Sequence, residues 1–314
     1  MRSLEIVKYE NIYKSSWDDF ISTSKNGTFL FYRDYMEYHS DRYHDHSLMV
    51  YSDTGKLLAV MPANIRGDTL HSHEGLSFGG IILDLQIRLE IFMELSSALL
   101  SYLRNLGVKE VIYKAIPYIY HRLPSDEDLY ALFNHNAVLY RRDVNSVLFM
   151  GNMVPYQTLR KRTLSKAKMH GIIVEKSEDY MGFMGILEQV LMKRHGLEPV
   201  HTFEEISLLA RRFPENIKLF TASGEGGLKA GVIIYEHDHV AHAQYTANSE
   251  EGMKIGALDP IFDFLIKDYY KDKRYISFGV SSEKEGKYLN KGLVAYKEGF
   301  GARTLAHDFY KICF

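Results

Sequence analysis

The chain has 314 residues, and its 38 lysines and arginines nearly balance its 40 aspartates and glutamates, giving a formal net charge of −2. Such a chain lacks the general basic field that marks a nucleic-acid-binding protein, so we expect no DNA partner. The single cysteine, Cys313, excludes a disulfide framework, a four-cysteine zinc site and an iron–sulfur cluster, and it is typical of a reducing compartment.

The distribution of apolar residues does not predict a membrane protein. The first residues lack the apolar region of a signal peptide, and the longest apolar stretch, 83–106, contains charged residues. We expect that stretch to form an amphipathic helix. The sequence thus predicts a cytoplasmic protein with no integral membrane association.

In the first half, apolar periodicity and turn residues predict alternating strands and helices. Strands are expected at 4–8, 47–51, 57–65, 70–76, 108–115 and 138–149, and helices at 17–24, 32–39, 86–106 and after Ser125. Asp53-Thr54-Gly55 is a hairpin signal between two of these strands. Gly107 ends the long helix.

The second half repeats this order of elements after a linker at 151–155. Helices are expected at 156–170, 180–194, 203–212, 256–270 and 288–298, and strands at 172–175, 217–222, 228–235, 240–247, 275–280 and 304–312. Two short matches, of 57–59 with 228–230 and of 71–73 with 242–244, share one offset. These observations favour a duplication, with domains at 1–150 and 151–314.

Several sequence blocks are more specific than the order of elements. They are 278–283 (FGVSSE), 289–293 (LNKGL), 296–302 (YKEGFGA), 195–202 (HGLEPVHT) and 72–80 (SHEGLSFGG). With the order of elements, these blocks resemble the GNAT acyltransferases, and in tandem they resemble the FemAB-like group found with surface-polysaccharide biosynthesis. The resemblance implies an α/β fold with mixed sheets, built from two tandem GNAT-like domains.

The same resemblance implies an N-acyltransferase that uses acetyl-CoA or another acyl-CoA as its cosubstrate. The acceptor would be a small-molecule amine, such as an amino-sugar precursor of a surface polysaccharide. Two alternatives remain open: an aminoacyl-tRNA-dependent transferase like the FemX enzymes, and a non-catalytic GNAT-derived protein that binds a saccharide or nucleotide. The chain has no G-x-S-x-G elbow, so direct attack of the amine is expected in place of covalent catalysis.

The acyl-CoA pyrophosphate loop of GNAT proteins reads Q/R-x-x-G-x-G/A before a helix. Residues 251–257 (EGMKIGA) keep only Gly256 and Ala257 in register. Small residues at such a place let backbone N–H groups approach phosphates. The resemblance therefore assigns cofactor binding to Gly256, Ala257, Gln244 and Asn290, and the first half offers no equivalent loop.

Two histidines and a tyrosine are candidates for proton transfer. His195 and His201 flank the loop 196–200, and imidazole accepts protons near neutral pH. Both also suit ordinary helix-end positions. By the resemblance, Gln244 and Tyr245 lie on the strand that splays open to admit the thioester, where Tyr245 either protonates the leaving thiolate or packs.

Three further catalytic or binding candidates follow the last central strand. Glu283 and Asn290 lie where a strand ends and a helix begins, a frequent ligand position in α/β proteins. Lys297 coincides with a lysine near the transferred carbonyl in FemX-type enzymes, where it would stabilise an oxyanion. The alternative for Lys297 is a solvent-facing lysine at a helix end.

The expected helix at 156–170 is strongly cationic, with Arg160, Lys161, Arg162, Lys166 and Lys168. Such a helix binds phosphates of a nucleotide- or lipid-linked sugar or of tRNA, or it is a solvated face. Arg160 is our candidate for a substrate contact.

The remaining substrate-binding candidates are histidines of the first half. FemX-like enzymes place a basic residue for a nucleotide-sugar diphosphate on the second helix. This chain offers His39 and Arg42 there, which disfavours that substrate, and His73 lies in the block at 72–80. His237 and His239 could share a metal ion, but no third ligand has a recognisable spacing, so no metal site is predicted.

Overall fold

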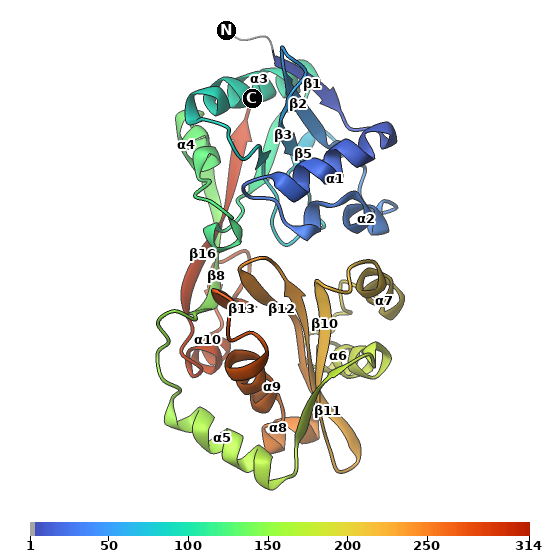
Figure 1. The fold of residues 1–314 in the computed structure, drawn as a ribbon, viewed down its shortest axis with the longest axis vertical. Coiled ribbons are helices and arrows are strands. Elements are labelled where there is room, and N and C mark those ends of the chain that lie inside the picture. Colours follow the sequence, from blue (N-terminus) through green and yellow to red (C-terminus); the bar gives the residue numbers. More distant parts are fainter. Residues whose placement is uncertain (1–3) are drawn as a thin grey trace. The chain divides into compact units, whose positions relative to one another are not determined.

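The structure is a computed structural model that describes residues 4–314 (Figure 1). The chain forms two compact units, and the first contains the residues up to Asp143 together with Lys284–Tyr288 and Ala306–Phe314. The second contains Val144–Glu283 and Leu289–Leu305. A single cut at 150/151 does not describe these units, because the strands that carry residues 138–149 and 303–313 each belong to both.

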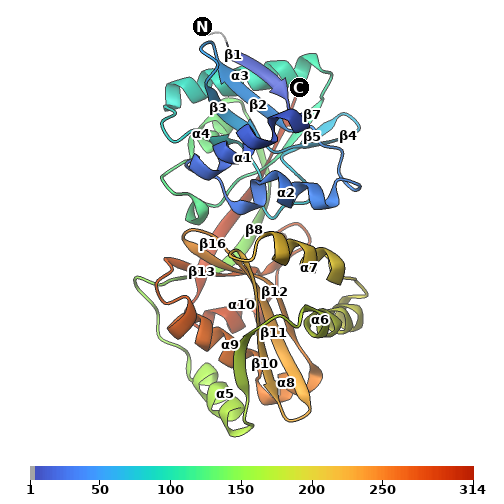
Figure 2. The same cartoon turned by 45° about the vertical axis from the view of Figure 1, so that its right-hand side comes forward.

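The first unit has a four-stranded sheet in the order β1-β2-β3-β6, and it contains the strands β4-β5-β7-β16 of a ten-stranded sheet. The strands are β1 (Leu4–Lys8), β2 (Leu48–Ser52), β3 (Leu57–Met61), β4 (Asn64–Arg66), β5 (Thr69–His71), β6 (Ile82–Leu83), β7 (Glu110–Lys114) and β16 (Arg303–Cys313). The helices are α1 (Lys14–Thr23), α2 (Arg33–Met36), α3 (Leu89–Asn105) and α4 (Glu127–Asn134), and α1 packs against α2 (Figure 2). The C-terminal strand completes this unit because Phe309 pairs with Lys114.

Apolar periodicity explains the core of the first unit. Phe92, Leu95, Leu99 and Leu103 recur at helical spacing along α3, and all four are buried against strands of this unit. The helix begins at Leu89, three residues later than predicted, because residues 85–86 form a turn and the N-cap residue Arg88 is extended.

The second unit is built on a mixed sheet in the order β8-β13-β12-β11-β10-β9. Its strands are β8 (Val138–Phe149), β9 (Ile173–Ser177), β10 (Ile217–Gly224), β11 (Gly227–Glu236), β12 (Val240–Asn248) and β13 (Tyr275–Val280), with a small ladder of β14 (Ser282–Glu283) and β15 (Tyr288–Leu289). The helices are α5 (Thr158–Met169), α6 (Tyr180–His195), α7 (Phe203–Arg212), α8 (Glu250–Ile255), α9 (Leu258–Phe264) and α10 (Lys291–Glu298). All neighbouring strands from β9 to β12 are antiparallel, and β12 and β13 are parallel.

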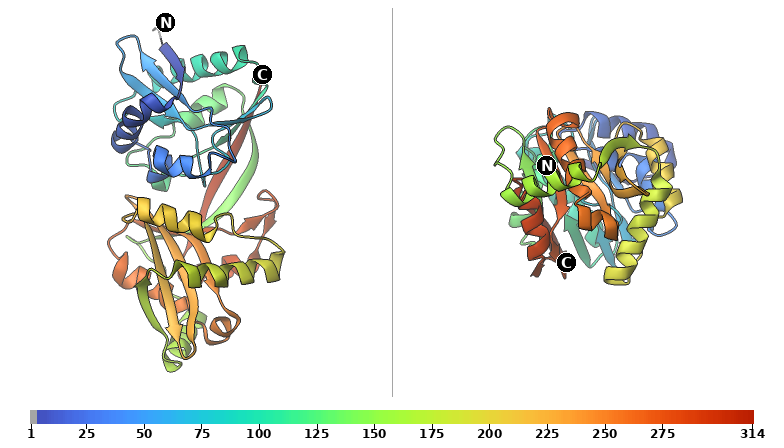
Figure 3. Two further views of the ribbon diagram at one scale, coloured as in Figure 1. Left: turned by 90° about the vertical axis from the view of Figure 1, so that its right-hand side faces the viewer. Right: turned by 90° about the horizontal axis from the view of Figure 1, so that it is seen from below.

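Alternation along β11 decides which helices cover which face of this sheet. Ala230, Val232 and Ile234 belong to the apolar core that includes α9. Gly231 faces the other way, where Phe183 of α6 packs so closely that a Cβ on Gly231 would overlap its ring. Helices α6 and α7 therefore lie side by side on one face, and α9 lies on the other (Figure 3).

The predicted α/β class with mixed sheets is confirmed. Two predicted helices are interrupted in the structure. The helix expected at 256–270 is α9 followed by a π-helical turn, Leu265–Tyr269, and the helix expected at 32–39 consists of α2 between two 3-10 turns, Phe29–Phe31 and Glu37–His39.

Candidate active site

The central strands of the second unit part from each other. Strands β12 and β13 pair only over residues 240–242 and 275–277. Beyond this point β12 stays paired with β11 as far as Asn248, whereas β13 pairs with β8. We call the unpaired stretch between residues 243–248 and 278–280 the β12–β13 gap.

A β-bulge lies on the β12 side of this gap. Ile233 pairs with Tyr245 and Ile234 pairs with Ala243, so Gln244 is the extra residue. The side-chain oxygen Oε1 of Gln244 is buried and has no hydrogen-bond partner in the described chain. A buried amide oxygen without a protein partner is suited to accept a hydrogen bond from a ligand.

His201 and Tyr245 meet beside the gap. His201 lies between α6 and α7, directly before Thr202, whose side chain begins α7 in a capping box with Glu205. The Nδ1 atom of His201 is 2.5 Å from Oη of Tyr245, and only 4% of His201 is exposed. The structure thus brings two predicted catalytic residues into direct contact, although they are 44 residues apart in the chain.

Two further polar residues at the gap were missed by the sequence analysis. Tyr235 pairs with His242 as Ile233 pairs with Tyr245, so His242 and Tyr245 share one face of β12. Nδ1 of His242 is 3.0 Å from Oγ of Ser277, which also accepts a hydrogen bond from the backbone N–H of Gly279 at 3.3 Å. Strand alternation could have indicated His242, but nothing local predicts that β13 turns away at Ser277.

Lys297 is buried at the other edge of the gap, with 5% of its surface exposed. Its Nζ donates to the carbonyl oxygens of Gly279 at 2.9 Å and Val280 at 2.7 Å, and to Oγ of Ser281 at 2.9 Å. Burial lowers the pKa of Lys297 to about 7. The interpretation of this residue as a solvent-facing lysine is therefore wrong.

Glu283 and Asn290 lie together on the surface of the second unit. Nδ2 of Asn290 donates to Oε1 of Glu283 at 2.8 Å, and Oδ1 of Asn290 accepts from the N–H of Leu293 at 3.0 Å. Asn290 is therefore the N-cap of α10, a structural role that needs no ligand. The predicted roles of Glu283 in catalysis and of Asn290 in cofactor binding stay predictions.

The expected pyrophosphate loop does not have the geometry of a phosphate cradle. The N–H groups of Gly256 and Ala257 both donate to the carbonyl oxygen of Gly252, at 2.8 and 2.9 Å, and the N–H of Asp259 donates to the carbonyl oxygen of Gly256 at 3.3 Å. A Cβ on Gly256 would lie 2.2 Å from Cγ2 of Thr163, so α5 covers this loop. The residues present do not fit a CoA pyrophosphate here.

Arg160 is also engaged within the protein. Its Nη1 donates to both carboxylate oxygens of Asp259, at 2.9 and 2.8 Å, and its guanidinium lies 4.7 Å from the ring centre of Tyr296. Burial raises the pKa of Asp259 to about 6 although Arg160 acts in the opposite direction. The predicted substrate contact of Arg160 would require it to leave this ion pair.

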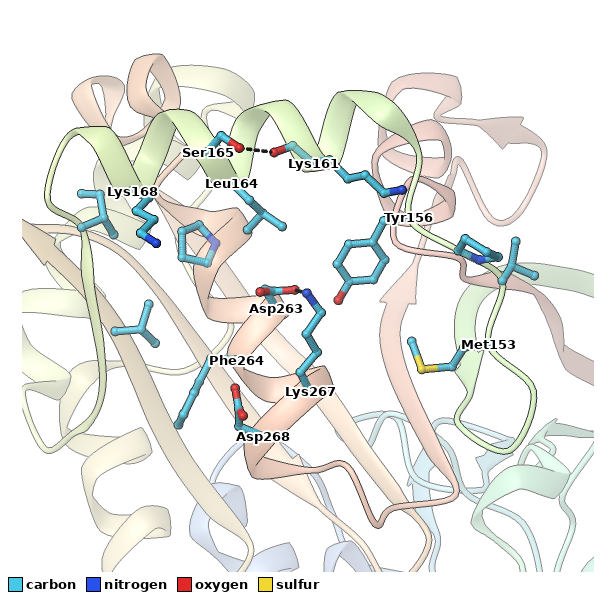
Figure 4. A pocket seen from close by; sticks show the side chains of 15 residues that line it. Met153, Tyr156, Lys161, Leu164, Ser165, Lys168, Asp263, Phe264, Lys267 and Asp268 are labelled. Atoms are coloured by element: carbon cyan, nitrogen blue, oxygen red, sulfur yellow. Dashed lines mark hydrogen bonds and ion pairs between the residues drawn. The ribbon is translucent and has the colours of Figure 1, made fainter.

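The neighbouring side of α5 borders a groove of about 860 Å³, with β9 and the outer side of α9 as its other walls (Figure 4). Leu164 and Phe264 contribute apolar surface, and Lys267 forms an ion pair with Asp263 at 2.5 Å. Lys161 and Lys168 also line the groove, and within residues 4–314 neither forms an ion pair. This is the part of the cationic helix that remains available to a ligand.

The two histidines predicted to bind substrate lie in the first unit, where their ring centres are 5.3 Å apart. Both are buried, and burial lowers the pKa of His39 to about 4 and that of His73 to about 3. Both imidazoles are therefore uncharged at neutral pH and do not supply a cation for a diphosphate.

One candidate lies outside the described side chains. His195 is the last residue of α6, and the structure does not describe its side chain. Residues 4–314 contain no cluster of three or more His, Cys, Asp or Glu side chains arranged for a metal ion. Within the same part of the chain, every helix is too short or too polar to cross a bilayer.

The fold is shared with solved acyltransferase structures. The chain is similar to FemX, with a TM-score of 0.68 and 10% identity over 99% of this chain and 97% of that chain. It is also similar to L-PGS from Bacillus licheniformis (TM-score 0.61, 13% identity, 96% of this chain and 92% of that chain) and to a tandem GNAT protein from the clavulanic acid biosynthesis pathway (0.51, 11%, 98% of each). No family model matches the chain, and no curated protein matches its sequence. The expected GNAT-like fold is confirmed, and at these identities the likeness concerns the fold alone.

Proposed function

We propose that the chain is an N-acyltransferase in which an amine attacks an activated carbonyl held in the β12–β13 gap. The observation that carries this proposal is the parting of β12 and β13 beside the buried contact of His201 with Tyr245. A parting of two strands can receive an extended acyl donor, and a histidine–tyrosine pair can move a proton at that place.

The proton transfer follows from the atoms in contact. In the neutral tautomer that carries its proton on Nε2, Nδ1 of His201 accepts a hydrogen bond from the hydroxyl of Tyr245. The attacking amine loses a proton as its nitrogen bonds to the carbonyl carbon. Tyr245 takes up this proton while it passes its own to His201. The bond between the carbonyl carbon and the leaving group then breaks, and His201 returns the proton through Tyr245 to the leaving oxygen.

The closed loop at Gly256 supports an aminoacyl-tRNA over an acyl-CoA as the proposed donor. Because its N–H groups bond within the chain, an acyl-CoA would lose the pyrophosphate contacts expected there. An aminoacyl-tRNA needs no such loop, since its carbonyl is activated as an ester. Lys161 and Lys168 in the α5 groove would contact RNA phosphates.

The acceptor is the less defined partner. We propose a primary amine on a small molecule, and the amino sugars of surface-polysaccharide precursors are the first class to test. The uncharged His39 and His73 disfavour a diphosphate bound at these two residues.

The proposal is tested by transfer assays with purified protein. Aminoacylated total tRNA and a panel of acyl-CoAs are incubated with amine acceptors, and product is detected by mass spectrometry. We expect transfer from aminoacyl-tRNA. Transfer from an acyl-CoA but not from aminoacyl-tRNA would refute the proposed donor. If neither donor gives product with any acceptor of the panel, the proposed transferase activity is refuted.

The proton-transfer pair is tested by Tyr245→Phe. Because general acid–base groups contribute about 100-fold or more to rate, this variant should lower kcat by at least 10-fold with donor affinity unchanged. Tyr130→Phe, at a tyrosine that is 51% exposed, is the matched control. An unchanged kcat in Tyr245→Phe would remove Tyr245 from the mechanism.

A further inference from the structure

Because β13 turns away from β12, part of its backbone has no hydrogen-bonding partner on β12 at the gap. In a continuous sheet, the backbone groups of residues 278–280 would pair with β12, but β12 does not reach them. Strand β8 pairs with Val280 only after a register shift that follows Ser277. Because these residues are mostly buried, their carbonyl oxygens need partners other than water.

Side chains supply these partners in place of the missing strand. Lys297 donates to the carbonyl oxygens of Gly279 and Val280, and Ser277 accepts from the N–H of Gly279. The third donor of Lys297 binds Oγ of Ser281. In its ammonium form Lys297 has three N–H donors, and all three are used within the protein.

Gly279 has a left-handed backbone conformation that residues other than glycine rarely adopt. Its φ is +73°, in the region that favours glycine, and it lies in the strand segment that leaves β12. Lys297 binds the carbonyl oxygen of this same residue. The lysine therefore stabilises the conformation by which β13 opens the gap.

We infer that Lys297 is a positioning residue that substitutes for strand β12 along the edge of the gap, and that it donates no hydrogen bond to the reacting carbonyl. This inference rests on the proposed function only in assigning the gap to the acyl donor. The oxyanion formed during acyl transfer must then be stabilised by groups other than Lys297. The lysine sets the width of the site and thereby the affinity for the donor.

The test separates positioning from catalysis by measuring the segment itself. Lys297→Met removes all three donors at similar length, and Ser281→Ala removes one acceptor with less risk to folding. Lys291→Met, at an exposed lysine in the first turn of the same helix, is the matched control. Hydrogen exchange of residues 277–281 is followed by mass spectrometry, and donor affinity and kcat are measured in parallel.

We expect Lys297→Met to speed exchange of residues 277–281 by at least 10-fold and to weaken donor binding by at least 10-fold. Ser281→Ala should change both in the same direction by a smaller factor, and Lys291→Met should change neither. If Lys297→Met turned over about 100-fold more slowly, with exchange and donor affinity as in the parent, the inference would be overturned and Lys297 would be a catalytic donor. If Lys297→Met does not fold, unchanged exchange in Ser281→Ala would overturn it.

The exchange measurement does not depend on turnover. If no donor gives product, the proposed function fails, and exchange in the two variants still decides whether Lys297 holds the edge of the gap.

Discussion

The buried pair of Tyr113 and Asp128 predicts how the stability of the first unit depends on pH. Oη of Tyr113 donates to Oδ2 of Asp128 at 2.7 Å, and the backbone N–H of Leu129 donates to Oδ1 at 2.8 Å. Burial nevertheless raises the pKa of Asp128 from 3.8 to about 6. Since one pKa unit corresponds to about 1.4 kcal/mol, ionised Asp128 costs the folded state about 3 kcal/mol relative to its protonated form.

The sign follows from the raised pKa. Below about pH 3 the carboxyl is protonated in both the folded and the unfolded chain. Between pH 4 and about 6 the unfolded chain loses this proton first, so the free energy of unfolding falls as pH rises. Above pH 6 the full cost of about 3 kcal/mol is present.

The variant Asp128→Asn removes this titration. The amide cannot match both hydrogen bonds of the carboxyl, which costs about 1 kcal/mol at every pH. The variant should therefore be about 1 kcal/mol less stable than the parent at pH 4 and about 2 kcal/mol more stable at pH 7.5.

Trp17 provides the assay. It is the only tryptophan of the chain, it is fully buried in the first unit, and its Nε1 donates to the carbonyl oxygen of Phe31 at 2.8 Å. Its fluorescence during urea unfolding reports this unit, and Asp272→Asn at an exposed aspartate is the control. Parallel stability curves for Asp128→Asn and the parent between pH 4 and 7.5 would refute the reasoning.

Two further predictions concern α5. Arg160→Met leaves the carboxyl of Asp259 buried without its cation, so the second unit should lose about 3 kcal/mol and α5 should exchange its amide hydrogens faster, as measured by mass spectrometry. The double variant Lys161→Glu, Lys168→Glu should weaken binding of single-stranded RNA and reduce the slope of log K against log[salt] by about 1.4, as measured by fluorescence anisotropy.

Each of these two predictions has a control variant at an exposed residue of the second unit. Arg162→Met changes an exposed arginine of α5 and should leave stability and exchange unaltered. Lys176→Glu, at an exposed residue of β9, should not change the salt slope. Equal destabilisation by Arg162→Met would contradict the role of the Arg160–Asp259 pair, and an unchanged slope in the double variant would remove the groove from RNA binding.

Local patterns predicted most of the elements of this fold. The helical spacing of apolar residues in α3 indicates one buried face, and the continuous apolar run in β11 indicates burial on both faces. Both patterns are visible within a single segment. The predicted first and last residues of these elements were less accurate than their type and order. The sequence could not predict the interruption of the helix after Phe264, because a π-helical turn keeps helical residues while changing their hydrogen bonds.

The candidate site was predictable only in part. His201, Tyr245 and Lys297 were identified from motifs, yet the contact of His201 with Tyr245 joins residues from different elements. Gly256 and Ala257 matched a phosphate-binding pattern. The pattern specifies small residues but not whether their N–H groups are free, and here these groups bond to Gly252.

The sequence by itself determined the class of fold, the order of elements and the residue types suited to acyl transfer, because periodicity and local motifs are properties of short segments. Only the tertiary structure decided which of these residues have their polar groups engaged within the protein. Packing of α5 covers the loop at Gly256 and binds Arg160 to Asp259, and the turn of β13 uses every donor of Lys297. The physical reason is that a polar group has few hydrogen-bonding positions, and partners distant in the chain determine whether any of them remains for a substrate.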